Sequence, residues 1–127
     1  MTNLPQLNQI DVIVRDVPRA AAFFSEVLGL PLVVNEERFA QLESGPITIM
    51  LSPDALVPVE QARGIILHFQ VEDVSQALED ARQKGAVVLR EMELTPWGWE
   101  SAMIRGPEEG IIIDFYLPKV ALQNGQC

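Results

Sequence analysis

The stretch GIILHFQVEDVSQALEDARQKGA, residues 64–86, contains the pattern that decides the fold. Apolar and other side chains alternate over its first part, which predicts a half-buried β-strand. Asp73 follows and is suited to cap the start of a helix, while Gly85 is suited to end it. The single histidine of the chain, His68, lies on the predicted strand. Residues 64–86 therefore predict a strand and a helix that together carry the only imidazole.

An earlier stretch, NQIDVIVRDVPRAAAFFSEVLGL at residues 8–30, repeats this pattern at a distance of 57 positions. Asp16 takes the place of Asp73, and the first helix is predicted to run from there to Gly29. Three short strands are predicted after each helix, over residues 31–36, 38–43 and 47–51 and over residues 86–91, 99–105 and 111–117. Each half therefore has the order βαβββ.

The repeat predicts an α+β fold of two tandem βαβββ modules, residues 7–52 and 64–118, joined by a linker over residues 53–63. A half of about 55 residues buries too little surface to be stable alone, so we expect the two sheets to pair side by side. The helices are expected to cover the outer face of the resulting curved mixed sheet, and the other face to surround a cleft. Residues 1–127 are predicted to form a single domain, with a frayed tail over residues 123–127.

The charge and composition of the chain argue against several classes of partner. The formal net charge is −9 and Lys and Arg form no cluster, which argues against binding to nucleic acid or to anionic membranes. No apolar run approaches the roughly 20 residues that span a bilayer, and the first residues lack the features of a signal peptide. Cys127 is the only cysteine, so neither an intramolecular disulfide nor a Cys-based metal site is expected. These features predict a cytoplasmic protein.

Each half contains several short sequence phrases, and these phrases follow one another in the same order as in a known family. In the first half they are VRDVPRA at residues 14–20, Phe24, and VLGL at residues 27–30. In the second half they are FQVEDV at residues 69–74, WGW at residues 97–99, and GPEEG at residues 106–110. These phrases resemble the vicinal oxygen chelate superfamily, which includes glyoxalases, bleomycin-resistance proteins and extradiol dioxygenases. The resemblance implies the two-module fold and leaves the chemistry open, since this fold hosts several chemistries.

The resemblance also implies where a metal would bind in members that use one. Those members take one ligand from each of four strands, and the matching positions here are Gln9, Met50, Ile66 and Asp114. A thioether is a poor ligand for the divalent ions of the family, and isoleucine offers no ligand atom. One histidine is also too few for a facial triad or for a three-histidine zinc site. No cofactor is therefore expected; if a divalent metal does bind, the expected ligands are Gln9, His68 and Asp114.

His68 is expected to point into the cleft, and its symmetry mate in the first half is Asp11. Three interpretations remain open. In the first, His68 is a cleft-lining or core side chain that is hydrogen-bonded to Asp11 or Gln70. In the second, the pair of His68 and Asp11 orients a ligand or acts as an acid and base. In the third, a displaced metal site is formed by Asp11, His68, Asp114 and Gln9.

Asp114 lies in an otherwise apolar strand over residues 111–117. Because an unpaired buried carboxylate is costly, this side chain must face the cleft, a partner or a metal. Both a functional role and a structural hydrogen-bond role remain open for it. Trp97 and Trp99 either wall a ligand pocket or close one end of the core.

The resemblance favours a protein that binds a small molecule in its cleft without the standard metal site, similar in kind to the bleomycin-resistance proteins. Those proteins typically bind their ligand in a cleft shared by two subunits, which implies a homodimer. The expected ligand-binding residues are Gln9, Asp11, Phe39, Met50, His68, Trp97, Trp99, Asp114 and Tyr116.

Two other functions remain open. The alternative is a metal-dependent glyoxalase-like lyase or isomerase, in which a metal held by Gln9, His68 and Asp114 polarises the substrate. If the cleft is catalytic, the candidate acid and base are His68 and Asp11. The third function is an interaction module that binds no ligand. The sequence does not predict which small molecule binds.

Overall fold

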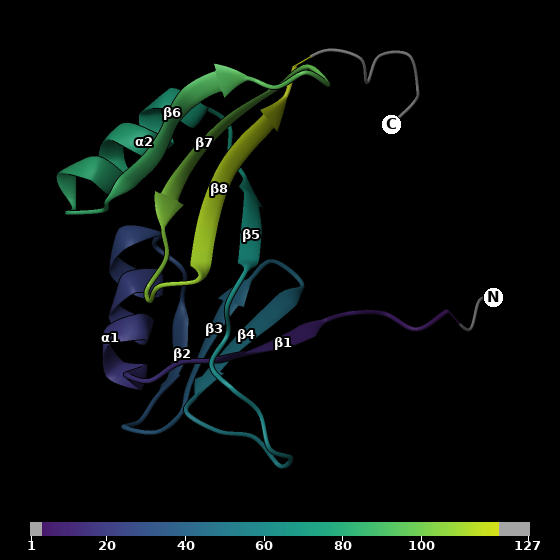
Figure 1. Ribbon diagram of the computed structural model, residues 1–127, viewed down its shortest axis with the longest axis vertical. Helices are drawn as coiled ribbons and strands as arrows, with labels where there is room; N and C mark the ends of the chain where they lie inside the picture. Colours follow the sequence, from purple (N-terminus) through teal and green to yellow (C-terminus); the bar gives the residue numbers. More distant parts are fainter. Residues whose placement is uncertain (1–3, 120–127) are drawn as a thin grey trace. The chain divides into compact units, whose positions relative to one another are not determined.

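The computed structural model describes residues 4–119, so Cys127 and the predicted tail over residues 123–127 lie outside the described residues. The chain divides into two compact units between Ala62 and Arg63. Figure 1 shows the ribbon coloured along the chain, with the first unit in purple to blue and the second in teal to yellow.

The first unit contains β1 (Gln9–Ile13), α1 (Val17–Ala22), η1 (Phe23–Val27), β2 (Leu32–Asn35), β3 (Ala40–Ser44) and β4 (Ile47–Ser52). Within residues 4–62 the strands form a four-stranded sheet in the order β1-β4-β3-β2, in which only β1 and β4 are parallel. α1 contacts β2, β3 and β4. Val12, Leu42 and Leu51 are fully buried between the helix and the sheet, as is Phe24. The apolar side chains that alternate along β1, and those at helical spacing after Asp16, contribute to this core.

The first helix differs from its prediction. The sequence predicts one helix from Asp16 to Gly29, whereas the structure has six α-helical residues followed by the π-helical turn η1. The wider turn is closed by a hydrogen bond from Leu28 N–H to the Phe23 carbonyl, 3.4 Å long. Within this turn Phe24 is fully buried, and the Phe23 ring meets the Phe24 ring edge to face with centroids 5.5 Å apart. Hydrophobic spacing alone does not distinguish such a turn from α-helix.

The second unit contains β5 (Ile65–Gln70), α2 (Val74–Gln83), β6 (Val88–Leu94), β7 (Trp99–Arg105) and β8 (Ile111–Pro118). Within residues 63–119 the strands form a four-stranded sheet in the order β5-β8-β7-β6, in which β5 and β8 are parallel. Asp73 caps α2, since its carboxylate accepts a hydrogen bond from Gln76 N–H at 3.0 Å. The predicted capping residue is therefore confirmed.

The two faces of the second sheet have different roles. α2 packs on β6, β7 and β8 through Val74, Leu78 and Ala81, which are buried. On β7 and β8, alternate side chains are buried on the face that α2 covers, and they form the core of the unit: Ala102, Ile104, Ile111, Ile113 and Phe115. The intervening side chains of the same strands face away from α2, and they include polar groups.

The predicted fold class is confirmed: two βαβββ modules, each with a mixed four-stranded sheet, are present within residues 4–119. β7 has the predicted bounds, while β6 begins and ends later than the predicted strand over residues 86–91. Within the described residues, no helix is both long and apolar enough to cross a bilayer.

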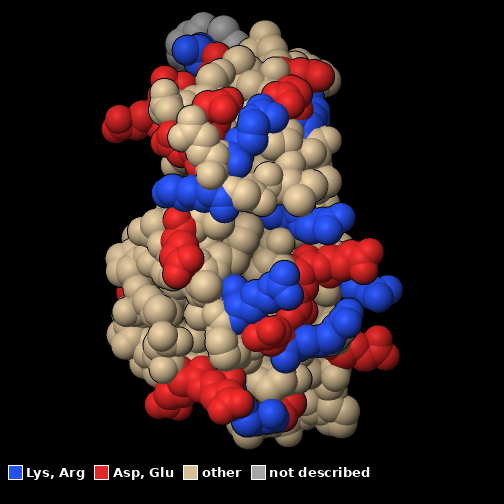
Figure 2. Space-filling model, turned by 90° about the vertical axis from the view of Figure 1, so that its left-hand side faces the viewer, with Lys and Arg blue, Asp and Glu red and all other residues tan. Residues whose placement is uncertain are grey.

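Acidic and basic side chains are interspersed on the face drawn in Figure 2. One such pair joins α2 to β6, where the Arg82 guanidinium donates a hydrogen bond to Glu91 at 2.9 Å. This hydrogen bond lowers the pKa of the Glu91 carboxyl below its ordinary value. Both side chains are solvent-exposed, so the pair contributes little to stability.

Candidate functional site

A pocket of about 320 Å³ lies on the face of the second sheet that points away from α2. Residues of all four strands of this sheet and of the β6–β7 turn line it: Ile66, His68, Arg90, Thr95, Pro96, Trp97, Trp99, Ser101, Met103, Asp114 and Tyr116. Every lining residue belongs to the second unit. The pocket is therefore a property of one βαβββ module.

The polar centre of the pocket is built on the parallel pair β5 and β8. The register sets His68 directly beside Asp114, and His68 Nδ1 lies 2.7 Å from one carboxylate oxygen of Asp114. Ser101, on β7, donates a hydrogen bond of 2.6 Å from its hydroxyl to the other carboxylate oxygen. Both oxygens of the carboxylate are thus hydrogen-bonded, and among the described residues no buried side-chain N or O atom lacks a partner.

Burial differs sharply across this cluster. Asp114 and Ser101 are each 4% exposed, whereas the His68 side chain is 55% exposed. A carboxylate in such a place is stable only if it is hydrogen-bonded, and hydrogen bonds to a charged group contribute about 1.5–3 kcal/mol each. Asp114 therefore fixes the orientation of an imidazole that remains accessible from the pocket.

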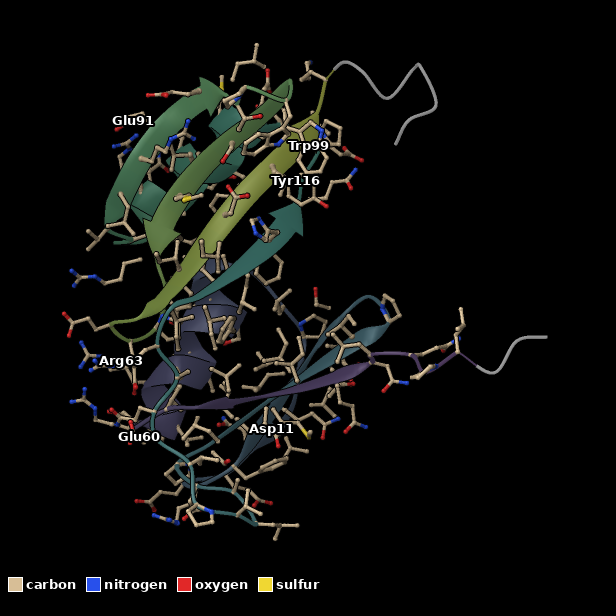
Figure 3. The ribbon with its side chains drawn as sticks, turned by 45° about the vertical axis from the view of Figure 1, so that its right-hand side comes forward. Asp11, Glu60, Arg63, Glu91, Trp99 and Tyr116 are labelled. Carbon is tan, nitrogen blue, oxygen red and sulfur yellow. The ribbon has the colours of Figure 1, made fainter. Side chains whose placement is uncertain are left out.

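Aromatic rings form one wall of the pocket. Trp99 on β7 and Tyr116 on β8 stack with their ring centroids 5.0 Å apart and their planes 18° from parallel. Figure 3 shows the two side chains next to each other on the second sheet. The His68 ring meets Tyr116 edge to face at 6.1 Å. These contacts hold the rings of Trp99, Tyr116 and His68 in fixed orientations around the pocket.

The β6–β7 turn brings a further aromatic side chain to the rim. Gly98 N–H donates to the Thr95 carbonyl at 2.9 Å, and Trp99 N–H donates to the Thr95 hydroxyl at 3.0 Å. Pro96 occupies the second position of the turn, where its fixed φ is favourable, and Gly98 has φ of 91°, a conformation that few other residues adopt. Trp97 therefore lies at the tip of a defined turn and is 62% exposed.

The cationic group of the pocket is already paired. Arg90 on β6 donates to the Ser101 carbonyl at 3.4 Å and to the Glu93 carboxylate at 3.1 Å. These contacts hold its guanidinium along the wall and offset its charge. The pocket is therefore largely apolar, with its polar groups gathered around Asp114.

The structure brings five of the predicted ligand-binding residues into this pocket: His68, Trp97, Trp99, Asp114 and Tyr116. The other four, Gln9, Asp11, Phe39 and Met50, belong to the first unit and are not among the residues that line the pocket.

In that unit Asp11 on β1 is the register partner of Met50 on β4. Of the three interpretations of His68, the one that pairs it with Asp11 or Gln70 is wrong about the partner, because His68 is hydrogen-bonded to Asp114. The internal repeat shows which positions of the two modules are equivalent, but it does not show which side chains touch. The parallel register of β5 and β8 places Asp114 beside His68.

Sequence reasoning missed five lining residues: Arg90, Thr95, Pro96, Ser101 and Met103. Ser101 and Met103 could have been found, because they alternate with Trp99 on a strand whose bounds are predicted correctly. Thr95 and Pro96 lie beyond the predicted end of β6, whereas Arg90 lies inside the predicted strand, and nothing in the sequence placed its side chain in the pocket.

The ligand set that the resemblance implies for metal-using members does not match the residues of this pocket. Among residues 4–119, no group of three or more His, Cys, Asp and Glu side chains is arranged to hold a metal ion. Ile66 stands at one of the expected ligand positions and offers no ligand atom. Asp114 stands at another, but both of its oxygens accept hydrogen bonds from Ser101 and His68.

Comparisons with known proteins identify the family. The model of the family described as "Glyoxalase/Bleomycin resistance protein/Dioxygenase superfamily" matches residues 6–115. The chain is similar to the uncharacterized protein YraH of Bacillus subtilis (strain 168), with 26% identity over 121 residues, which cover 84% of this chain and 94% of YraH.

Solved structures are similar over most of the chain. One is described as a conserved domain protein; it is 39% identical, has a TM-score of 0.82, and the match covers 91% of this chain and all of that one, 100%. TioX from Micromonospora sp. ML1 is 19% identical with a TM-score of 0.74, covering 91% of this chain and 100% of TioX. A glyoxalase-related enzyme from Fulvimarina pelagi is 20% identical with a TM-score of 0.77, covering 90% and 88%. The last two show the fold alone.

Proposed function

Since the chain belongs to the Glyoxalase/Bleomycin resistance protein/Dioxygenase superfamily, we propose that it binds a small molecule in the pocket of its second unit, without the metal site of the superfamily's metal enzymes. One observation carries the proposal: a pocket of about 320 Å³ combines aromatic walls with one cluster of oriented polar groups. Small-molecule sites typically have this composition, since apolar walls supply affinity and a few polar groups fix the orientation.

The aromatic residues support a ligand with a flat apolar body. The Trp99 and Tyr116 rings are already ordered by their mutual stacking, so binding costs little conformational entropy at these side chains. Trp97 exposes most of its surface at the rim, where a ligand would cover it. A bicyclic aromatic compound suits the size of the pocket and these surfaces.

The metal-dependent alternative receives less support from the site. It would use Gln9, His68 and Asp114, but His68 and Asp114 are bonded to each other, and Ser101 occupies the remaining carboxylate oxygen. Nε2 of His68 could bind a metal while Nδ1 stays hydrogen-bonded to Asp114, but among the described residues no other imidazole, carboxylate or thiolate lines this pocket to complete a site. Stoichiometric divalent metal that is lost in an Asp114→Ala variant would be the finding that favours this alternative.

A homodimer, in which two subunits share their ligand sites, remains part of the proposal through the resemblance to the bleomycin-resistance proteins alone. The residues described above as lining the pocket all belong to the second unit of the chain. Binding of a probe to these residues and formation of a homodimer are separate expectations.

We expect the native protein to bind indole, a flat bicyclic probe, in the pocket of the second unit. In a two-dimensional NMR titration, the indole N–H signals of Trp97 and Trp99 and the amide signals of β7 and β8 should shift with one saturable curve. Trp97→Ala should weaken binding about 3-fold, because an exposed aromatic contact at the rim is lost.

The matched control is Leu56→Ala, which removes a fully exposed apolar side chain in the first unit and should leave the affinity unchanged. Shifts that are absent, or that are confined to residues 4–62, would contradict the proposal.

A further inference from the structure

The hydrogen bond between His68 and Asp114 determines which nitrogen of the imidazole carries the proton. Asp114 also accepts a hydrogen bond from Ser101, and a carboxylate can only accept hydrogen bonds, so the proton in its hydrogen bond with His68 lies on Nδ1. A neutral imidazole with a proton on Nδ1 has a lone pair on Nε2. The buried carboxylate thus makes Nε2 of His68 a hydrogen-bond acceptor.

Nε2 is the ring nitrogen that remains for a ligand. His68 lines the pocket and its side chain is 55% exposed, while Nδ1 is occupied by Asp114. Among the residues that the structure describes, none donates to Nε2 at hydrogen-bond distance. The ring is fixed on one side by Asp114 and by its edge-to-face contact with Tyr116. Its accepting edge therefore has a set direction relative to the aromatic wall.

Two of the polar groups that line the pocket are engaged as donors to the protein. The Ser101 hydroxyl donates to Asp114, and the Arg90 guanidinium donates to the Ser101 carbonyl and to Glu93. A ligand group that can only accept hydrogen bonds could not form one with the lone pair of Nε2. That group would also lose its hydrogen bonds to water. A hydroxyl or N–H group in the same place would replace a hydrogen bond to water with one to the protein.

We infer that the pocket selects planar aromatic ligands that carry a hydroxyl or N–H group, and that this group donates a hydrogen bond to Nε2 of His68. The inference rests on the proposed function and specifies its ligand class. The stacked pair of Trp99 and Tyr116 contacts the flat body, and His68 distinguishes a donor from an acceptor at its edge. Asp114 and Ser101 are positioning residues, since they fix the tautomer and direction of His68 without contacting the ligand.

The tautomer can be measured in the native protein without any ligand. Because His68 is the only histidine, a long-range proton–nitrogen NMR spectrum at pH 8 contains the ring nitrogens of one imidazole. We expect Nδ1 to have the signal of a protonated nitrogen and Nε2 that of an unprotonated one. A protonated Nε2, with or without a proton on Nδ1, would overturn the inference.

The ligand class is tested with two probes of nearly equal shape: indole, whose N–H donates, and benzofuran, in which an oxygen replaces that N–H. We expect the native protein to bind indole about 2- to 10-fold more tightly, as one neutral hydrogen bond permits. In His68→Phe the preference should disappear while both probes still bind. In Gln70→Ala, an exposed position on the same strand and outside the pocket lining, the preference should persist.

The possible failures are distinguishable. Equal affinity of the native protein for indole and benzofuran would overturn the inference and leave the proposed function standing. Failure of both probes to bind would overturn the proposed function and the inference with it.

Discussion

Replacement of Asp114 with alanine is expected to lower the free energy of unfolding by about 2–4 kcal/mol, because two hydrogen bonds to a charged group are lost and a buried donor is left unpaired. Ser101, which is 4% exposed, would keep its hydroxyl in the interior without its acceptor. His68 would lose the group that orients its ring. Urea denaturation followed by circular dichroism measures this change.

Two further variants make the stability result specific. Asp11→Ala removes an exposed carboxylate from β1 of the other unit and should change the free energy of unfolding by less than about 0.5 kcal/mol. Asp114→Asn keeps the shape of the side chain and should cost less than the alanine variant. A loss below about 1 kcal/mol in Asp114→Ala would show that the buried cluster does not stabilise the unit in the way its geometry indicates.

Trp99→Ala is expected to weaken indole binding about 10-fold, which corresponds to about 1.4 kcal/mol. The change removes the ring that stacks on Tyr116 at 5.0 Å and opens the wall of the pocket. Aromatic pairs contribute about 0.5–1.5 kcal/mol beyond the area they bury, so a smaller loss of stability should accompany the loss of affinity. The NMR titration that defines the native affinity measures the effect.

The matched variant is Trp99→Phe, which retains a ring that can stack on Tyr116. It should recover most of the affinity that alanine loses. If Trp99→Ala binds indole as tightly as the native protein, the stacked pair is a structural contact and forms no part of the ligand site.

The internal repeat made the fold predictable. Asp16 and Asp73 mark the same helix start in each half, and both are N-caps in the structure. Alternation along β5 correctly placed His68 on the face opposite Leu67 and Phe69. The π-helical turn after α1 was not predictable in this way, because its five residues are too few to show a periodicity of their own.

The candidate site was predictable only in part, because strand register is not visible in one sequence. Symmetry gave Asp11 as the counterpart of His68, whereas the parallel register of β5 and β8 makes Asp114 its partner. Alternation with Trp99 could have placed Ser101 on the face of the pocket, but nothing in the sequence shows that its hydroxyl reaches Asp114 from the neighbouring strand. Residues within one strand were thus easier to predict than contacts between strands.

The pocket of the second unit is proposed to bind a small molecule that donates a hydrogen bond to Nε2 of His68. A crystal structure of the native protein soaked with indole tests this proposal most directly. We expect electron density for indole against Trp99 and Tyr116, with its nitrogen at hydrogen-bond distance from Nε2 of His68. Indole bound elsewhere on the protein, with only water in this pocket, would contradict the proposed function.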